Sequence, residues 1–356
     1  MWIENKFFHQ DLEYILHCNY IPWDRFKGKT ILITGATGLL GFNIVSALSY
    51  VSLKKNIQLK VLALVRNKVK AKERFASALS DGAPIYFITG DLDHIPPINE
   101  HIDFIIHGGS PTASRYFVEY PVETIMTNLH SAISLLNLAK EKRVEGFLFL
   151  SSMEVYGEIH LHEKIRENHH CFINTMVPRS SYPEVKRMVE SLCACYAKEF
   201  HVPAKTIRLT QTFGIGVREN DNRVFAQFAR SAMAHKDIIL FTKGGTEHSY
   251  LYTGDAVTAT ITILLLGNTG EAYNAANEQT YCSIKELAEM IANLTIIKEK
   301  FAGPVRVIID ESRNKEHIYP PELYMDLDTR KLQSLGWSAK YGLEDMLVRM
   351  IETMDE

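Results

Sequence analysis

The stretch Thr34-Gly35-Ala36-Thr37-Gly38-Leu39-Leu40-Gly41 decides the fold, because it joins the apolar run Thr30-Ile31-Leu32-Ile33 to a helix-period stretch at residues 42–48. A strand that enters a glycine-rich turn and then a helix lets backbone amides approach a pyrophosphate at the positive end of the helix dipole. The three glycines permit, in order, the tight turn, the close approach and the packing of helix on strand. A glycine triplet alone also fits an ordinary turn, but the order strand, turn, helix predicts a dinucleotide site. The predicted coenzyme contacts in this turn are Gly35, Thr37, Gly38, Leu39, Leu40 and Gly41.

Length and composition indicate a globular protein with more than one lobe. The 356-residue chain is 46% hydrophobic and 23% charged, so it can bury a large core and is long for one domain. Its formal net charge of −3 provides no basic field for nucleic acid, and the lysine-rich residues 68–74 are interpreted as a solvated helix face. Charged residues near the N-terminus argue against a secretory signal or membrane span. We therefore expect a cytoplasmic protein with no nucleic-acid or membrane partner.

Cysteine and histidine usage gives no sign of a disulfide or a metal site. Five cysteines form an odd set without framework spacing, which favours reduced thiols. Four histidines in a polar segment lack an accompanying ligand pattern, which indicates a solvated loop. We predict no bound metal. These histidines are His160, His162, His169 and His170.

Alternating strand and helix patterns follow the glycine turn. This alternation predicts an α/β fold of the Rossmann type, with a right-handed, doubly wound parallel sheet and a smaller, interleaved C-terminal substrate lobe. Strands are expected at residues 30–34, 59–65, 85–88, 103–107, 147–151, 205–209, 238–241 and 305–309. Helices are expected at 39–50, 68–80, 121–141, 183–200, 222–234 and 343–354, with a further helix after 283.

The chain is expected to divide into three parts. Residues 1–29 form an N-terminal extension, in which a helical face carrying Phe8, Leu12 and Ile15 would pack on the body or on a second subunit. The coenzyme-binding domain is expected at residues 30–210, with a return segment at about 238–276. The substrate lobe is assigned to residues 211–237 and 277–356.

A second chemical feature is the run Ser181-Tyr182-Pro183-Glu184-Val185-Lys186-Arg187. A helix started by its proline places Tyr182 and Lys186 on the same side, four residues apart. Lowering a tyrosine pKa from about 10 to near 7 needs roughly 4 kcal/mol, which a nearby ammonium and an oxidised nicotinamide would supply together. This spacing alone is common on surfaces, but its place after a fifth strand indicates a proton carrier.

A third feature, at residues 150–157, lies where the fifth strand ends. Ligands of open α/β sheets bind at the carboxyl ends of the strands. Ser152 would hydrogen-bond a substrate oxygen, and Glu154 would act as a base on a neighbouring carbon. The alternative, in which the serines close the strand and Glu154 is a solvated carboxylate, stays open.

Together, TGATGLLG at 34–41, SSMEVYG at 151–157 and YPEVK at 182–186 resemble the extended short-chain dehydrogenase/reductase family, the NAD-dependent epimerase/dehydratases of nucleotide sugars. The resemblance runs from about Lys29 to the C-terminus and looks closest to UDP-glucuronate decarboxylases, with dTDP-glucose 4,6-dehydratases next. It implies transient hydride transfer at the sugar 4-position, with Ser152, Tyr182 and Lys186 as the catalytic trio and Glu154 beside them. It also implies coenzyme contacts from Asp91, Leu92, His107, Gly108 and Gly109, and substrate contacts from Ser110, Gln211, Arg223 and His248.

Several departures from the family pattern leave the exact reaction open. The dehydratases have an aspartic acid where this chain has Met153, and the carboxylate-binding arginine of the decarboxylases falls near Leu323. The usual pyrophosphate arginine is replaced by His248 and the usual asparagine by Gln211, whereas Arg223 matches a nucleotide-contacting position. Epimerase, decarboxylase and dehydratase chemistry, and an NADPH-dependent reduction of a 4-keto sugar nucleotide, all remain possible. A non-catalytic NAD(P)-binding sensor is the alternative outside enzymes.

Coenzyme choice and oligomeric state have their own indications. In NAD-binding sites the second strand ends with an acidic residue that binds the ribose 2′-hydroxyl. Arg66 stands at this place and would bind the 2′-phosphate of NADP. Stacking of Arg66 on adenine is the alternative, so NAD and NADP both stay open. The resemblance implies a homodimer that pairs through the helices at 121–141 and 183–200. Leu135, Leu136, Leu138 and the region of Cys193 and Cys195 are apolar enough for this interface, although burial under their own sheet explains much of that pattern.

Overall fold

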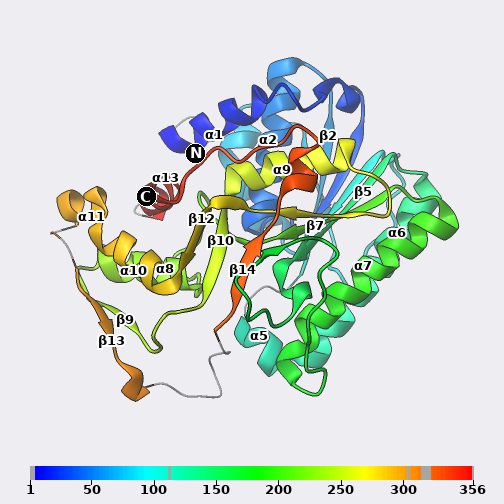
Figure 1. Cartoon of the computed structure of the whole chain (residues 1–356). Coiled ribbons are helices and arrows are strands. Elements are labelled where there is room, and N and C mark those ends of the chain that lie inside the picture. The colour runs from blue at the N-terminus through cyan, green and yellow to red at the C-terminus, as the bar shows by residue number, and fades with distance from the viewer. Residues whose placement is uncertain (1–4, 111–113, 302, 304, 314–321, 355–356) are drawn as a thin grey trace.

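The computed structural model describes residues 5–110, 114–301, 303, 305–313 and 322–354. Its main layer is a seven-stranded sheet in the order β11-β7-β5-β4-β1-β2-β3, in which every neighbouring pair is parallel (Figure 1). This confirms the predicted doubly wound α/β fold. The strands are β1 (Thr30–Thr34), β2 (Lys60–Val65), β3 (Ile85–Thr89), β4 (Phe104–His107), β5 (Gly146–Ser152), β7 (Ala204–Leu209) and β11 (Ala272–Ala275).

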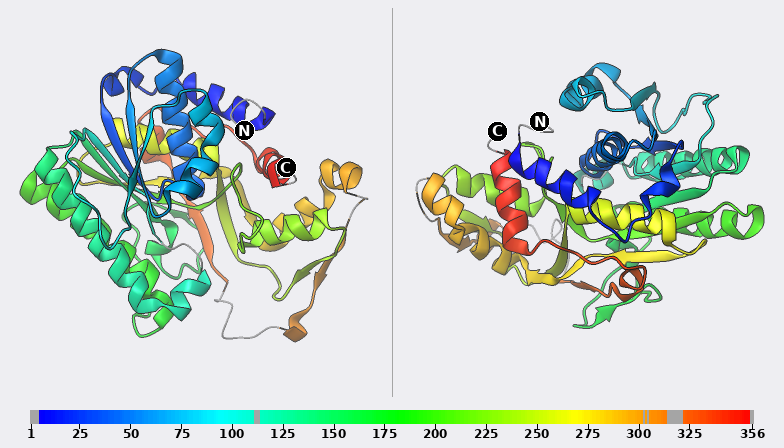
Figure 2. Two further views of the ribbon diagram at one scale, coloured as in Figure 1. Left: turned by 180° about the vertical axis from the view of Figure 1, so that it is seen from behind. Right: turned by 90° about the horizontal axis from the view of Figure 1, so that it is seen from above.

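Helices cover both faces of this sheet, because alternate strand residues point to opposite sides. Ile31 and Ile33 pack into the core beneath α2 (Leu39–Lys55) and α9 (Thr253–Leu266). Leu32 packs on the other side, into the core shared with α6 and α7. The latter two helices, α6 (Pro121–Lys142) and α7 (Ser181–Phe200), lie side by side in Figures 1 and 2.

The prediction of one continuous helix at residues 68–80 is wrong. It is divided into α3 (Lys68–Arg74) and α4 (Ala76–Ser80), and Phe75 separates them with a non-helical backbone. The buried Phe75 ring packs against Phe42 at 5.3 Å and Phe87 at 6.0 Å between centroids. The helix is therefore interrupted where the Phe75 ring packs into the core. The polar pattern of the segment did not indicate this interruption.

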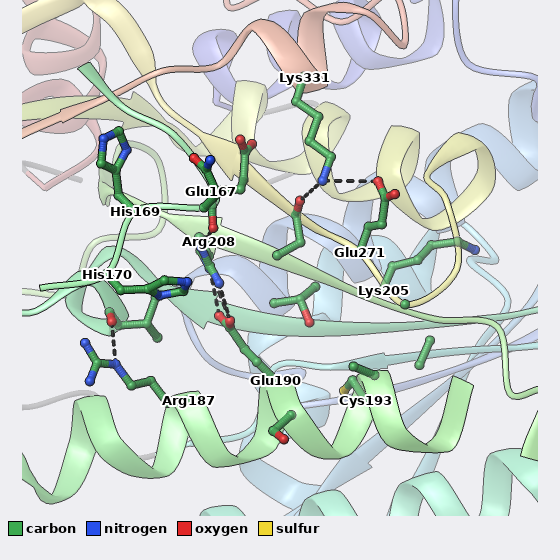
Figure 3. Close-up of a pocket in the computed structure, with 18 residues that line it drawn as sticks. Glu167, His169, His170, Arg187, Glu190, Cys193, Lys205, Arg208, Glu271 and Lys331 are labelled. Atoms are coloured by element: carbon green, nitrogen blue, oxygen red, sulfur yellow. Dashed lines mark hydrogen bonds and ion pairs between the residues drawn. The ribbon is translucent and has the colours of Figure 1, made fainter. Parts of the chain in front are cut away.

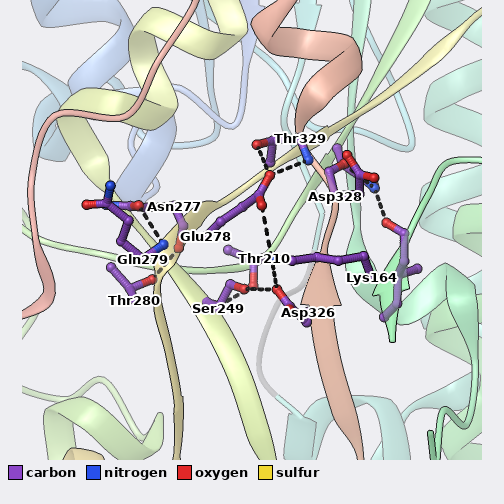
Figure 4. A network of polar contacts seen from close by, with 12 residues as sticks. Lys164, Thr210, Ser249, Asn277, Glu278, Gln279, Thr280, Asp326, Asp328 and Thr329 are labelled. Carbon is purple, nitrogen blue, oxygen red and sulfur yellow. Dashed lines mark hydrogen bonds and ion pairs between the residues drawn. The ribbon is translucent and has the colours of Figure 1, made fainter. Parts of the chain in front are cut away.

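A smaller lobe is built from two further sheets. The five-stranded sheet contains β6 (Lys164–Ile165), β8 (Gln211–Phe213), β10 (Glu247–Tyr252), β12 (Asn277–Ser283) and β14 (Tyr324–Leu327), none of which was predicted. A polar network joins three of these strands, since Lys164 Nζ donates to Asp326 at 2.8 Å and to Glu278 at 2.9 Å (Figure 4). The same lobe contains three helices, which are α8 (Val224–Met233), α10 (Ile284–Asn293) and α11 (Thr295–Lys300).

The chain returns to the large sheet later than the sequence indicated. The strand β9 (Ile238–Leu240) pairs with β13 (Val307–Ile309) in a separate two-stranded sheet, not with the large one. The return to the large sheet therefore begins later than the predicted residue 238, with α9 and β11. A short apolar run has the same pattern in either sheet, so periodicity did not distinguish them. The predicted domain boundaries otherwise stay predictions.

The N-terminal helix α1 (Lys6–Leu16) packs on the body of its own chain. Phe8 is 1% exposed and its ring stacks on Phe42 of α2 at 5.5 Å. The buried carboxylate of Asp11 pairs with Arg349 at 3.0 Å, which ties α1 to the terminal helix α13 (Leu343–Met354) (Figure 2). Of the two positions predicted for this helix, the structure therefore shows packing on the body.

Within the described part of the chain, no helix has the length and apolar character needed to cross a membrane. Over the same residues, no group of three or more acidic, histidine or cysteine side chains is arranged to hold a metal ion. The cysteines are free thiols.

Candidate active site

The glycine turn between β1 and α2 is a cradle that side chains would fill. Gly35 has a φ of +69°, and a Cβ there would lie 2.6 Å from the carbonyl oxygen of Gly108. A Cβ on Gly41 would lie 2.1 Å from the carbonyl oxygen of Gly35. Gly38 immediately precedes α2, whose 17 residues direct the positive end of their dipole at the turn. The residues present thus fit the pyrophosphate of a dinucleotide, which needs close approach to backbone amides.

Hydrogen bonds fix the neighbouring turn after β4 against the glycine turn. Thr34 Oγ1 accepts from the backbone N–H of Gly109 at 3.1 Å and lies 2.8 Å from His107 Nδ1. The other ring nitrogen of His107 lies 3.3 Å from Ser131 Oγ, and burial lowers the pKa of this histidine to about 3. Because both ring nitrogens are occupied inside the protein, the imidazole aligns β1, β4 and α6. A coenzyme contact by His107 would be limited to its main chain.

The structure brings together some of the other predicted coenzyme contacts. A Cβ on Gly109 would meet the Leu92 side chain at 2.7 Å, so these two predicted contacts are neighbours. Asp91 instead uses its Oδ1 to accept from the backbone N–H groups of Asp93 and His94, at 3.0 and 2.8 Å. Arg66 follows β2 directly and is exposed.

Tyr182 lies in the first turn of α7 and is nearly buried, with 8% of its surface exposed. Its ring stacks on Phe117 of α5 (Ser114–Glu119) at 4.1 Å between centroids, and the Ser152 hydroxyl lies near enough to the phenol to lower its pKa. Lys186 lies 5.5 Å from the centre of the Tyr182 ring. The structure therefore brings the predicted trio together at the carboxyl end of β5.

The protein's own groups do not make Tyr182 acidic, which corrects the electrostatic part of the sequence argument. Burial raises the pKa of the Tyr182 hydroxyl and Glu154 raises it further, whereas the Ser152 hydroxyl and Arg179 lower it. Burial also lowers the pKa of Lys186 to about 7, and its Nζ donates to the Leu150 carbonyl at 3.0 Å. Of the two charges invoked to lower the tyrosine pKa, the oxidised nicotinamide remains.

Glu154 is held by an ion pair that the sequence did not indicate. Its Oε2 accepts from Arg179 Nη2 at 2.8 Å, and its backbone N–H donates to Ser152 Oγ at 3.2 Å. Arg179 lies in a short 3₁₀ turn just before α7, and its guanidinium is 4.9 Å from the centre of the Phe117 ring. Arg179 is only three residues before Tyr182 in the chain, which could have indicated its closeness, whereas Phe117 lies too far along the chain for spacing to indicate its contact.

Three of the four predicted substrate residues lie in the smaller lobe. Gln211 and His248 belong to the neighbouring strands β8 and β10, and Arg223 caps α8. Arg223 pairs with Asp221 at 2.6 Å and stacks on Phe225, so its charge is already partly neutralised. His248 Nδ1 is buried and has no hydrogen-bond partner among the described residues, and burial lowers the pKa of this histidine to about 4. Ser110 lies in the turn after β4, at the edge of the described segment, and its neighbour Pro111 lies outside the described residues.

A separate pocket of about 530 Å³ lies between α7, β7 and the loop at 167–170 (Figure 3). Its charged groups largely neutralise one another, since Arg208 pairs with Glu190 at 2.7 Å and Lys331 with Glu271 at 3.1 Å. None of the predicted catalytic or coenzyme residues lines it. We therefore assign the chemistry to the cluster around Tyr182 instead.

Comparisons with known proteins agree with this fold and motif order. A family model described as the NAD dependent epimerase/dehydratase family matches residues 31–276. UDP-glucuronic acid decarboxylase 1 of Danio rerio is 26% identical over 325 residues, covering 91% of this chain and 72% of the relative.

Solved structures share the whole architecture at lower identity. An epimerase of Methanothermobacter thermautotrophicus superposes with a TM-score of 0.75 at 20% identity, covering 94% of each chain. A UDP-glucose 4-epimerase of Thermotoga maritima, solved with UDP-glucose, has a TM-score of 0.74 at 18% identity and covers 92% of this chain and 98% of its own.

Proposed function

The chain belongs to the NAD-dependent epimerase/dehydratase family, and from this we propose that it modifies the sugar of a nucleoside diphosphate sugar by transient oxidation at the 4-position. The observation that carries the proposal is the meeting of Ser152, Tyr182 and Lys186 at the carboxyl end of β5, on the sheet edge that also carries the glycine turn. The names of the relatives supply the substrate class, since they act on UDP-glucuronic acid or UDP-glucose.

Each residue of the site has a separate role in this oxidation. When bound, NAD(P) supplies a nicotinamide ring that accepts hydride from the sugar carbon. Tyr182 takes the proton of the sugar hydroxyl, and Ser152, whose hydroxyl is close to the phenol, orients the same oxygen. Lys186 is buried next to the phenol and would hold the coenzyme ribose with its remaining N–H groups. The backbone of the glycine turn would bind the pyrophosphate.

Epimerisation is the reaction that these residues support best. It needs only the trio, because return of hydride to the opposite face completes the reaction. Dehydration is disfavoured by Met153, which is buried and carries no proton for a departing hydroxyl. Decarboxylation lacks its late arginine at Leu323, and Glu154 is engaged by Arg179. Decarboxylation is nevertheless the second candidate, since the similar curated relatives are decarboxylases.

A panel of sugar nucleotides tests this proposal. The purified protein is incubated with UDP, dTDP, CDP and GDP sugars and either coenzyme, and the products are separated and weighed by mass spectrometry. An epimer has the mass of its substrate, a decarboxylated product has lost carbon dioxide, and a reduced 4-keto sugar appears only with added NADPH. Absence of turnover over the whole panel by a protein that binds coenzyme would instead favour the sensor alternative.

We propose that the protein forms a homodimer through α6 and α7. Leu135 and Leu136 are fully buried in their own chain and cannot serve the interface, which corrects that part of the prediction. We propose that exposed apolar side chains on the same helices form the interface instead. Val122 is 72% exposed, Met126 44% and Met188 54%. The cytoplasmic location stays an expectation.

A single charge on that face is expected to dissociate the dimer. In Val122→Glu, a carboxylate would be buried in the interface without a partner, which disfavours association. Val69→Glu is the matched control, because Val69 is also exposed, at 67%, but lies on α3, which packs on the opposite face of the sheet. Light scattering of the eluting protein should give a dimer for wild type and control and a monomer for Val122→Glu. A monomeric wild type would contradict the proposed interface.

A further inference from the structure

A nearly buried carboxylate lies one helical turn beyond the lysine of the proposed trio. Glu190 follows Lys186 by four residues on α7, as Lys186 follows Tyr182, so the three side chains lie along one side of the helix. The Glu190 side chain is 11% exposed, and its Oε1 accepts a hydrogen bond from Ser151 Oγ at 2.6 Å. Ser151 directly precedes Ser152 at the end of β5. Glu190 therefore joins the helix of the phenol and the lysine to the strand of Ser152.

An arginine from a second strand binds the same carboxylate. Arg208 of β7 donates to Glu190 from Nε, at 3.1 Å to each oxygen, and from Nη2 to Oε2 at 2.7 Å (Figure 3). Its Nη1 donates to the Tyr156 hydroxyl at 3.0 Å and to the Glu167 carbonyl at 2.8 Å. Arg208 and Ser151 are paired positions of β7 and β5, so they are neighbours across the sheet. Two adjacent strands thus donate to one carboxylate of α7.

These bonds are directional, whereas the rest of the contact between α7 and the sheet is apolar. Val185, Val189 and Cys193 of α7 pack into the core that contains Phe147 and Phe149 of β5. Apolar packing has no preferred direction, but hydrogen bonds to a charged group have a defined length and angle. A shift of the helix by one residue would move the phenol by about 1.5 Å along the axis. A misplacement of about 1 Å can lower a rate roughly a hundredfold.

Stability alone gives little reason for burying the charges of Glu190 and Arg208. A buried ion pair can often be replaced by apolar residues of similar volume without loss of stability, because removing two charges from water is costly. Loss of one partner is different, because the other charge then stays buried and unpaired. The position of the pair, next to the end of β5, therefore indicates a role other than stability.

A second link joins the same helix and strand. Lys186 Nζ donates to the Leu150 carbonyl at 3.0 Å, so the consecutive residues Leu150 and Ser151 bond to consecutive turns of α7. Glu190 also raises the pKa of Lys186, against the effect of burial. We propose, on the basis of the proposed function, that Glu190 is a positioning residue, which fixes α7 on β5 and β7 so that Tyr182 and Lys186 reach the sugar.

Four variants separate positioning from stability. Ser151→Ala removes the link to β5 and leaves the ion pair, whereas Glu190→Gln leaves Arg208 buried without its charged partner. Glu190→Met combined with Arg208→Met leaves neither charge unpaired, so this double variant should melt near the wild type. Glu184→Gln is the matched control, because Glu184 pairs with Arg187 of the same helix at 3.3 Å and binds neither strand.

Steady-state kinetics on the substrate found in the sugar-nucleotide panel, with melting temperatures, measure the effect. We expect Ser151→Ala and the double variant to lower kcat roughly ten- to hundredfold with KM little changed, because a misplaced phenol slows the chemical step. Glu190→Gln should be slower and also less stable, and Glu184→Gln should match the wild type. A double variant that recovers kcat together with stability would make the pair purely structural and overturn the inference. If the double variant does not fold, wild-type kcat in Ser151→Ala overturns it.

Crystal structures of the coenzyme-bound wild type and Ser151→Ala test the inference without turnover. We expect the Tyr182 hydroxyl of the variant to lie about 1 Å or more from its wild-type position relative to the nicotinamide. An unmoved hydroxyl would overturn the inference even where kcat falls. A wild type that binds coenzyme but turns over no sugar nucleotide would overturn the proposed function, and a displaced hydroxyl in the variant would still support the positioning role of Glu190.

Discussion

Tyr182→Phe is expected to lower kcat by roughly a hundredfold to ten-thousandfold, the range for removal of a group that transfers a proton in the transition state. The change deletes only the hydroxyl that would take the sugar proton. The ring keeps its stacking on Phe117, because phenylalanine has the same shape. Steady-state turnover of the substrate found in the sugar-nucleotide panel measures the loss.

Tyr196→Phe is the matched control for this variant. Tyr196 is on the same helix, and its hydroxyl donates to Asn137 Oδ1 at an exposed site, 2.9 Å away. It should keep wild-type turnover, and both variants should bind coenzyme and melt as the wild type does. Equal activity of Tyr182→Phe and Tyr196→Phe would remove Tyr182 from the reaction.

Lys186→Met is expected to abolish most of the activity while stabilising the folded protein. Lys186 is 3% exposed, and burial lowers its pKa to about 7, so folding places an ammonium where its charge is disfavoured. A methionine fills a similar volume without charge, and we expect a melting temperature higher by at least about 2 °C near neutral pH. Activity falls because the coenzyme ribose loses the donor that Lys186 would supply.

The pH dependence of that stabilisation has a definite sign. The folded pKa of Lys186, about 7, is below the ordinary lysine value of 10.5, so the unfolded chain binds more protons between these limits. Wild-type stability from this residue therefore rises with pH over that window, and its destabilising effect is complete below pH 7. The advantage of Lys186→Met should be greatest below pH 7 and shrink towards alkaline pH. A variant less stable than the wild type at every pH would mean that the bond to the Leu150 carbonyl outweighs the cost of the charge.

The large sheet and the trio could be predicted because their signals are local. The glycine turn carries its strand and helix on either side, and the spacing of Tyr182 and Lys186 follows from a single helix. Every strand of the seven-stranded sheet except β11 was predicted close to its observed bounds. Buried parallel strands form apolar runs, which sequence patterns indicate well.

The parts that could not be predicted depend on contacts between distant segments. The strands of the smaller lobe are short and carry polar side chains such as Lys164 and Glu278, whose pairing is visible only after folding. Phe117 on Tyr182, and Arg218 at Thr37, join residues 65 and 181 positions apart, respectively. The pKa of Tyr182 was misjudged for the same reason, because burial by Phe117 and the charge of Glu154 are tertiary effects.

Deuterium at the 4-position of the substrate sugar provides the most direct test of the central claim, that Tyr182 and the coenzyme oxidise this carbon transiently. The reaction is stopped by rapid acid quench, and label is sought by mass spectrometry in the nicotinamide and in the product. The account predicts deuterium on the reduced coenzyme during turnover, its return to the same carbon of the product, and no labelled coenzyme with Tyr182→Phe. Loss of the label to water while the coenzyme stays unlabelled would contradict it.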